Sequence, residues 1–343
     1  MLVHSHWHTV TTKAVEPCKP KPAVWQMATE YPKTSMSGEG LETFALEIAR
    51  ESHGSVTVDP TFQGDGRNAS SRVAAAIRDG TLAGGDAFGG AWGDCDHAFL
   101  LSSLPFLTTS VDDTYQLAVL ARDAYRKAFA KQGQRLIYMS PWPPTGLWSR
   151  HPIHTLEDLR ALTVRTYDET SAEVLRQTGA SALHLSFAEA LSRLKEGSIS
   201  AVLSSGDGGA GMKLWGHLPY FTAIDYAMPL SFSTVCIGAW HALSPFQQEA
   251  VNIAAQTTED RQWARLKTRM AENTRRMRAN GVEINSEPAA EVQRALLDAG
   301  STAIALWRAK VEGSWSALLD TWLRSSKEWQ FEAAPANGGT GHD

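Results

Sequence analysis

The feature that most constrains the fold is an uninterrupted helical stretch from residue 244 to residue 280. Ser244 is a suitable N-cap, Pro245 suits the first helical position, and Gly281 follows the last turn. No other glycine or proline interrupts the stretch, so a helix of about 35 residues would extend about 52 Å, beyond the width of one small domain. It is neither apolar enough for a membrane span nor regular in heptads. We therefore expect a helix that lies across two domains and braces them.

Length and composition agree with a two-domain globular protein. The chain has 343 residues, of which 43% are hydrophobic, and this length exceeds what one core usually organises. The 37 acidic and 32 basic residues give a net charge of −5, and no block of Lys or Arg stands out. Nucleic acid and anionic membranes are not expected as partners, because both require clustered positive charge. No apolar run approaches the roughly 18 residues that span a bilayer.

Neither the cysteines nor the N-terminal residues identify the cellular compartment of the protein. Cys18, Cys95 and Cys236 are far apart and form no CxxC pair, so neither a disulfide framework nor a metal site nor any cofactor is expected. Residues 1–22 and 331–343 are expected to be disordered. The start of the chain has neither the apolar segment nor the cleavage site of a secretory signal. Either a signal is missing from this sequence or the protein is cytoplasmic.

The first part of the chain alternates between strand and helix patterns. We expect a strand at 24–28, a helix at 41–51 and a strand at 55–58, which together form a βαβ unit. A further strand is expected at 135–140. The glycine-rich stretch at 84–93 is too irregular for the interior of an element, and we expect it to be a loop beside a cleft.

The alternation is clearest in the middle of the chain. Strands are expected at 163–167, 183–185 and 199–205, with helices at 169–177 and 186–197 between them. Strands that alternate with short helices imply a parallel sheet covered on both faces. The fold class is therefore α/β.

Arg165 is the strongest candidate for a binding residue. It lies within the strand expected at 163–167, where a guanidinium is costly unless it is paired. One interpretation is a structural salt bridge to a nearby carboxylate such as Asp168. The other is a clamp at the carboxyl edge of the sheet, where α/β proteins bind ligands, because a guanidinium can bind a carboxylate through two hydrogen bonds. Residue type alone leaves both open.

Aromatic residues gather in the irregular stretches of the chain. Trp142 and Trp148 flank a proline-rich turn at 141–146 rather than an amphipathic element, so they are harder to explain as core residues. An apolar cleft wall with one guanidinium would suit a hydrophobic monocarboxylate. The aromatic residues of these stretches are Tyr31, Phe88, Trp92, Trp142, Trp148, Tyr167, Trp215 and Tyr226.

An enzymatic function has little support in the sequence. The segment 206–211 matches G-x-G-x-x-G after an expected strand, and Asp225 lies at a suitable distance for a ribose contact, so an NAD-dependent oxidoreductase is the alternative. The helix that follows must end by Gly216 or Pro219, which is too short for a dinucleotide-binding unit. No nucleophile with its base is recognisable, and Ser204 lacks a G-x-S-x-G context. We expect a binding protein and not an enzyme.

Four segments in a fixed order give the chain a family resemblance. They are 103–106 (Ser-Leu-Pro-Phe), 156–165, 179–190 and 240–244 (Trp-His-Ala-Leu-Ser). Together they resemble the DctP-type solute-binding proteins of tripartite ATP-independent periplasmic (TRAP) transporters over most of the chain. The resemblance implies a two-lobed α/β fold of the periplasmic-binding-protein class II type, braced by one long helix.

The resemblance also implies lobe boundaries and partners. Lobe I would comprise residues 23–142 and 228–272, and lobe II residues 143–227 and 273–330. The protein would bind a small organic carboxylate in the periplasm, as a monomer, and present it to the membrane subunits of a transporter. A ligand sensor coupled to a receptor would share the cleft and differ in its partner.

The same resemblance assigns a role to Arg165, which falls on the arginine that pairs with the substrate carboxylate in this family. Sialate-binding members carry a second arginine where spacing places Thr145 here, so sialate is not expected. The Ser204-Ser205 pair and the tryptophan-rich cleft resemble binders of aromatic or branched 2-oxo and 2-hydroxy acids, such as benzoylformate or mandelate. The other binding positions implied by the resemblance are Glu30, Tyr31, Phe88, Trp92, Trp142, Trp148, Asp168, Ser204, Ser205 and Tyr226.

Overall fold

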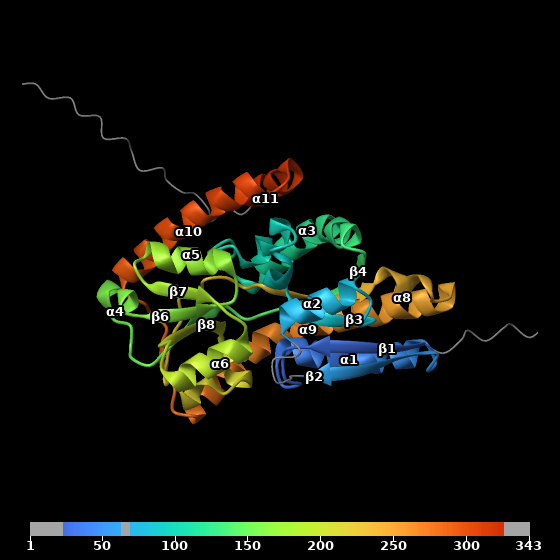
Figure 1. Cartoon of the computed structure of the whole chain (residues 1–343), viewed down its shortest axis with the longest axis horizontal. Helices are drawn as coiled ribbons and strands as arrows, with labels where there is room; N and C mark the ends of the chain where they lie inside the picture. The colour runs from blue at the N-terminus through green and yellow to red at the C-terminus, as the bar shows by residue number, and fades with distance from the viewer. Residues whose placement is uncertain (1–22, 63–68, 326–343) are drawn as a thin grey trace, which may run out of the picture.

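The strands form two separate sheets, which confirms the expected α/β class (Figure 1). The computed structural model describes residues 23–62 and 69–325. The disorder expected for residues 1–22 and 331–343 therefore falls outside the described residues. Within those two described ranges, no helix is both long and apolar enough to cross a membrane.

The first sheet has the strand order β2-β1-β3-β10-β4. β1 pairs in parallel with β2 and β3, whereas β10 is antiparallel to β3 and β4. Its strands are β1 (Ala23–Thr29), β2 (Val56–Phe62), β3 (Gly84–Phe88), β4 (Gln134–Pro141) and β10 (Leu230–Cys236). The helices packed around it are α1 (Met36–Glu51), α2 (Ser70–Arg78), α3 (Val111–Lys131) and α8 (Ile237–His241), with the 3-10 turns η1 (Gly89–Trp92) and η2 (His97–Ser103).

The second sheet has the order β11-β9-β5-β8-β6-β7. β6 pairs in parallel with β7 and β8, as expected for three strands separated by two short helices. Its strands are β5 (Thr145–Ser149), β6 (Thr163–Thr166), β7 (Ser181–His184), β8 (Ala201–Ser205), β9 (Tyr220–Thr222) and β11 (Glu283–Asn285). The helices of this part are α4 (Leu156–Arg160), α5 (Glu169–Gln177), α6 (Phe187–Glu196) and α7 (Gly206–Gly211), with the 3-10 turn η3 (Leu214–Gly216).

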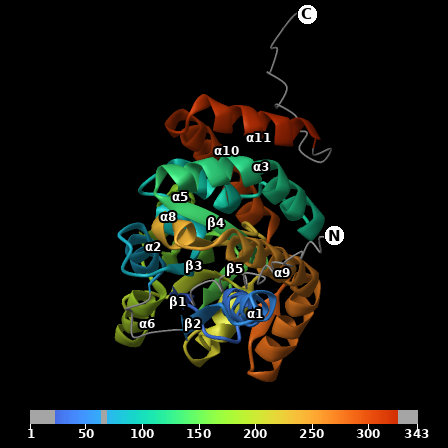
Figure 2. The same cartoon turned by 90° about the vertical axis from the view of Figure 1, so that its right-hand side faces the viewer.

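The long helix is α9 (Pro245–Ala279), 35 residues in one piece. Ser244 and Gln247 form a capping box at its start, with Pro245 at the first helical position. Val251 joins the hydrophobic cluster of the first sheet around Trp25, while Met277 joins the cluster of the second sheet. α9 contacts α1 and β4, in the part of the molecule that holds the first sheet, and α7 and β11, in the part that holds the second. Figure 2 shows α9 beside α1. The predicted brace is confirmed.

Two C-terminal helices make a second connection between the two parts. α10 (Ala290–Lys310) packs against α4 and α5, and α11 (Gly313–Ser325) packs against α3 (Figure 1). The indole of Trp307 donates a hydrogen bond to the carbonyl of His97 at 2.6 Å, and that of Trp322 to the carbonyl of Leu107 at 3.0 Å. These indoles fasten the C-terminal helices to the part that holds the first sheet.

The prediction of a loop at 84–93 is wrong for its first half, because Gly84–Phe88 is the buried strand β3. A Cβ on Gly85 would lie 2.6 Å from the carbonyl oxygen of Ala28 and 2.7 Å from Val73 Cγ1. The glycines therefore permit close packing of a central strand against its neighbours and do not mark a loop.

This packing makes Gly85→Ala a test of the fold. We expect the variant to lower the free energy of unfolding by roughly 1–3 kcal/mol, because the new methyl group overpacks the core. The control is Gly216→Ala, where a Cβ would meet nothing within 4 Å. Urea unfolding followed by circular dichroism compares the two. Equal stability of both variants would contradict the packing role of Gly85.

Candidate functional site

A small cavity lies between the two sheets, where β1, β6 and β8 end and the chain passes from β4 to β5. Its volume is about 30 Å³. Six of the binding positions suggested by the sequence meet there, together with residues that the sequence did not single out as a site. The lining residues are Tyr31, Phe88, Trp142, Thr145, Arg165, Tyr167, Phe187, Ser204, Ser205, Gly208 and Pro229.

A wider pocket of about 220 Å³ adjoins this cavity and forms its mouth. Tyr31, Phe88, Arg165 and Tyr167 line both spaces, so Arg165 lies at the boundary between them. Glu30 lines the mouth and not the inner cavity. A ligand that enters through the mouth would therefore meet the guanidinium before it reaches the serines further in.

Arg165 is buried in β6, with 4% of its surface exposed. Its Nε donates to the carbonyl of Leu185 at 2.7 Å and its Nη1 to the carbonyl of Leu203 at 3.5 Å. The guanidinium lies 4.4 Å over the ring of Phe187. Burial lowers the pKa of Arg165, and the charge of Glu30 opposes that shift.

No carboxylate forms an ion pair with Arg165 among residues 23–62 and 69–325. The structural salt bridge to Asp168, one of the two interpretations of the sequence, is not formed. Asp168 instead caps α5 through Ser171 and accepts a hydrogen bond from Ser103 Oγ at 2.8 Å. A buried guanidinium held by carbonyl oxygens, with no anion among the described residues, is an electrostatic environment that favours an external anion.

The carboxylate of Glu30 is directed at two helix N-termini. It accepts hydrogen bonds from the backbone N–H and the Oγ of Ser70, at 3.0 and 2.8 Å, and from the backbone N–H of Phe187 at 3.3 Å. α2 has no side-chain cap at Ala69, so Glu30 supplies the missing acceptor. The carboxylate of Glu30 therefore stabilises the N-termini of α2 and α6.

Aromatic rings form much of the cavity wall. The ring centroids of Tyr31 and Trp142 are 4.5 Å apart, and those of Phe88 and Tyr167 are 4.9 Å apart. The indole Nε1 of Trp142 donates to Ser231 Oγ at 2.8 Å, which fixes the ring at the start of the proline-rich turn. Burial raises the pKa of Tyr31 far above its usual range, so its hydroxyl is neutral.

Four suggested positions line neither the cavity nor its mouth. Trp92 lies in the core of the first sheet, against Phe99, Phe129 and Phe232. Asp168 is the N-cap of α5, as described above. Tyr226 is fully buried against the rings of Phe106 and Tyr167, and Trp148 is fully buried beneath α7.

The glycines of 206–211 serve packing around Trp148. They form the short helix α7, in which a Cβ on Gly209 would lie 2.2 Å from the indole and one on Gly208 would lie 2.6 Å from Ser204 Oγ. Trp148 also donates a hydrogen bond to the carbonyl of Ser205 at 3.3 Å. The glycine spacing that resembled a dinucleotide motif thus reflects a close contact between α7 and β5.

Phe187, Tyr167, Thr145, Gly208 and Pro229 were missed as site residues, although Tyr167 was noted among the aromatics and Thr145 as a family position. Phe187 follows the capping residue Ser186 and begins α6. A capped helix start directly after a strand was the available signal, because helix N-termini at the carboxyl edge of a sheet face the ligand cleft.

Comparison with known proteins identifies the family. A sequence model described as "Bacterial extracellular solute-binding protein, family 7", the DctP family, matches residues 27–300. The chain belongs to this family. Its relatives are solute receptors of TRAP transport and not enzymes, so the oxidoreductase alternative is not supported.

Individual relatives agree with this assignment. A solute-binding protein of Chromohalobacter salexigens is 24% identical over 269 residues, which cover 76% of this chain and 78% of the relative. DctP7 of Bordetella pertussis, an extracytoplasmic solute receptor binding pyroglutamic acid, has a TM-score of 0.83 at 25% identity, over 88% of this chain and 99% of its own. A TRAP periplasmic solute-binding protein of C. salexigens with bound D-glucuronate has a TM-score of 0.80 at 19% identity, over 88% and 99%. The fold is thus the two-lobed fold of these receptors.

A row of buried polar side chains crosses the first sheet close to the cavity. Asp86 lies beside Thr29 and opposite Ser233, which lies opposite Tyr138, and all four are buried. Asp86 accepts a hydrogen bond from Ser37, and no cation pairs with it among the described residues. Burial raises the pKa of Asp86 to about 7.

The raised pKa of Asp86 predicts a pH effect on stability. The unfolded carboxyl titrates near pH 4, so between about pH 4 and about pH 7 the folded state binds more protons than the unfolded state. The contribution of Asp86 to the free energy of unfolding therefore falls as the pH rises through this window and is constant above it. The stability of Asp86→Asn relative to wild type should therefore increase as the pH rises from about 4 to about 7.

Urea unfolding of wild type and Asp86→Asn at a series of pH values measures that difference. Asp298→Asn, at an exposed position of α10, is the matched control and should follow wild type at every pH. A constant difference between wild type and Asp86→Asn from pH 4 to pH 8 would show that folding does not raise the pKa of Asp86.

Proposed function

We propose that this protein is the periplasmic solute-binding subunit of a TRAP transporter and binds a small organic monocarboxylate through Arg165. The observation that carries the proposal is the burial of the Arg165 guanidinium, at 4% exposure, without an anionic partner among the described residues. A ligand carboxylate would supply the missing charge and accept two hydrogen bonds from the planar guanidinium. The membrane subunits of the transporter would then recognise the loaded form.

The cavity walls support a compact acid with an apolar body. Tyr31, Trp142, Phe88 and Phe187 offer aromatic surface, and the hydroxyls of Ser204 and Ser205 offer a few polar contacts. Thr145 lines the cavity, so the position of the second arginine of sialate binders is uncharged here. We propose aromatic or branched 2-oxo and 2-hydroxy acids as the ligand class. The pyroglutamic acid of the B. pertussis receptor is the rival ligand, because that receptor is 25% identical to this chain.

The lobes would close over the ligand as rigid units. We propose lobe I at 23–142 with 228–272, and lobe II at 143–227 with 273–330, so that the chain crosses between them after β4, just before β10 and within α9. Closure about these connections would bring Tyr31 and Phe88 of lobe I against Arg165 and Phe187 of lobe II.

A thermal-shift assay separates the ligand classes. The panel contains benzoylformate, mandelate, L-pyroglutamate, D-glucuronate and NADH. A ligand at about 100 times its Kd adds about 2.7 kcal/mol to the free energy of unfolding, which raises Tm measurably. We expect the largest rise in Tm with benzoylformate or mandelate and none with NADH. A rise with L-pyroglutamate alone would replace the ligand class, and no rise with any acid would contradict carboxylate binding.

Substitution of Arg165 tests the clamp. Arg165→Ala should weaken the affinity for the best acid by roughly 30-fold to several thousand-fold, because loss of a buried charge partner costs about 2–5 kcal/mol. Arg165→Lys keeps the charge but loses the planar pair of donors, so we expect an intermediate loss. The control is Arg193→Ala, at an exposed position on α6 of the same lobe, which should bind as wild type does. Titration calorimetry gives the affinities of wild type and the three variants, and a change below threefold for Arg165→Ala would refute the clamp.

A further inference from the structure

Asp207 is a fully buried carboxylate that ligand binding as proposed above does not use. It lies in α7, the short helix beneath the cavity. Ser205, which lines the cavity, caps α7 by accepting a hydrogen bond from the N–H of Gly208 at 3.0 Å. Asp207 is therefore attached to the floor of the binding cavity while its side chain points elsewhere.

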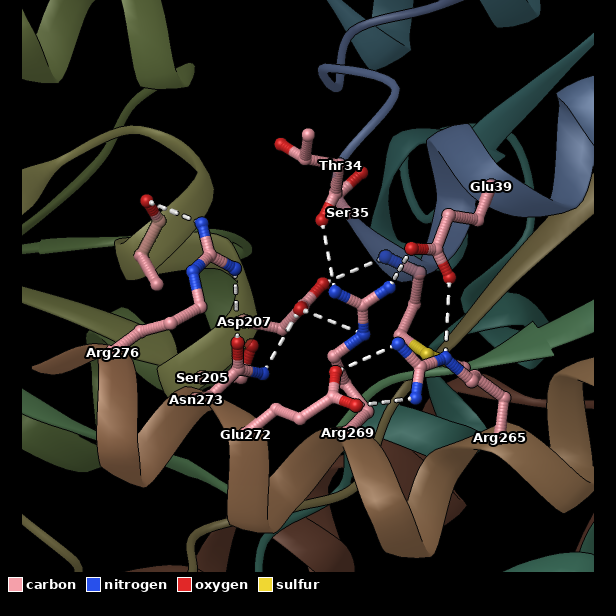
Figure 3. A network of polar contacts seen from close by, with 12 residues as sticks. Thr34, Ser35, Glu39, Ser205, Asp207, Arg265, Arg269, Glu272, Asn273 and Arg276 are labelled. Atoms are coloured by element: carbon pink, nitrogen blue, oxygen red, sulfur yellow. Dashed lines mark hydrogen bonds and ion pairs between the residues drawn. The ribbon is translucent and has the colours of Figure 1, made fainter.

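The side chain of Asp207 bridges three helices that are distant in sequence (Figure 3). Its Oδ2 accepts a hydrogen bond from the backbone N–H of Met36 at 2.7 Å, and its Oδ1 accepts one from Asn273 Nδ2 at 2.9 Å. Arg269 Nε lies 3.6 Å from Oδ1. Met36 is the first residue of α1, and the N-terminus of a helix stabilises a negative charge.

Arg269 extends this bridge toward α1. It is buried in α9, donates from Nη1 to the carbonyl of Thr34 at 3.1 Å and forms an ion pair with Glu39. Arg265, one turn earlier, lies 3.6 Å from Glu39 and 2.7 Å from Glu272. Figure 3 shows these side chains converging between α1 and α9, with Asp207 on the side of α7. The network thus joins α1 of the first part to α7 of the second through α9.

Glu30 makes the reciprocal contact. It lies just after β1 of the first sheet and accepts a hydrogen bond from the N–H of Phe187, the first residue of α6 beside the second sheet. Asp207, just after β8 of the second sheet, accepts one from the first residue of α1. Each of the two parts therefore places one carboxylate on the N-terminus of a helix in the other part.

We propose that Asp207, together with Glu30, is a positioning residue that stabilises the closed arrangement of the lobes and thereby raises the affinity for the ligand. This rests on the proposed two-lobed binding function. Separation of the lobes would remove Asp207 from the N-terminus of α1, while its contact with Asn273 of lobe II would remain. The apparent affinity of a receptor falls in proportion to the fraction of molecules in the binding-competent arrangement. Loss of the carboxylate should therefore weaken binding although it does not touch the ligand.

A distance measurement between the lobes tests this proposal. Spin labels are placed at Arg72→Cys on α2 and Lys195→Cys on α6, both exposed positions, in a background with Cys18, Cys95 and Cys236 replaced by Ser. Double electron–electron resonance is recorded without ligand and with an excess of L-pyroglutamate or of benzoylformate. Asp207→Ala should shift the distance distribution toward longer values, and Glu30→Gln should shift it in the same direction.

The matched control is Asp158→Asn. Asp158 accepts hydrogen bonds from the N–H groups of His154 and Thr155 and so caps α4 within lobe II alone. It should leave the interlobe distance at the wild-type value. Circular dichroism and Tm confirm that each variant is folded, and Asp207→Asn, which keeps the shape of the side chain, serves if Asp207→Ala does not fold. We expect roughly a tenfold loss of acid affinity in Asp207→Ala, equivalent to about 1.4 kcal/mol.

The outcomes separate this proposal from the binding function. If an acid shortens the distance equally in wild type and Asp207→Ala, and the ligand-free distributions coincide, the closing role is refuted while carboxylate binding stands. If no acid changes the distance but Asp207→Ala is more open than wild type, the proposed ligands are wrong and the role of Asp207 stands.

Discussion

Helix α9 packs against both sheets, and the relation between the two parts of the molecule depends on that contact. Val251 is buried against the first sheet and Met277 against the second, so one rigid element sets the separation of the two cores. Between them, Arg269 and Asn273 carry buried polar groups that α1 and α7 satisfy. A helix that bridges two cores must present polar groups where it passes the gap, and those groups become contacts between the lobes.

The gap that α9 spans contains one unusual group, the buried guanidinium of Arg165. Carbonyl oxygens and the face of Phe187 partly compensate its desolvation, and the acids nearest to it are otherwise engaged: Glu30 at two helix N-termini and Asp168 as a helix cap. A charge kept in this state is costly to the isolated protein. A ligand carboxylate would relieve that cost, which connects the stability of the closed form to its loading.

How much the sequence predicted depended on whether the cause was local. The caps and the absence of helix breakers determine α9, and the capping residue Ser186 locates α6, so both were predictable. β3 was missed because its glycines permit close packing against the carbonyl of Ala28, which is a contact between distant segments of the chain. For the same reason Trp92 and Trp142 looked alike, although tertiary packing places the first in a core and the second in the cavity wall.

A crystal structure of the protein with the acid that raises its Tm most would test the central claim most directly. The account predicts that the ligand lies between the two sheets, with its carboxylate within hydrogen-bonding distance of two nitrogens of the Arg165 guanidinium and its apolar body against Tyr31 and Trp142. A ligand bound elsewhere, or in this cavity with its carboxylate directed away from Arg165, would contradict it.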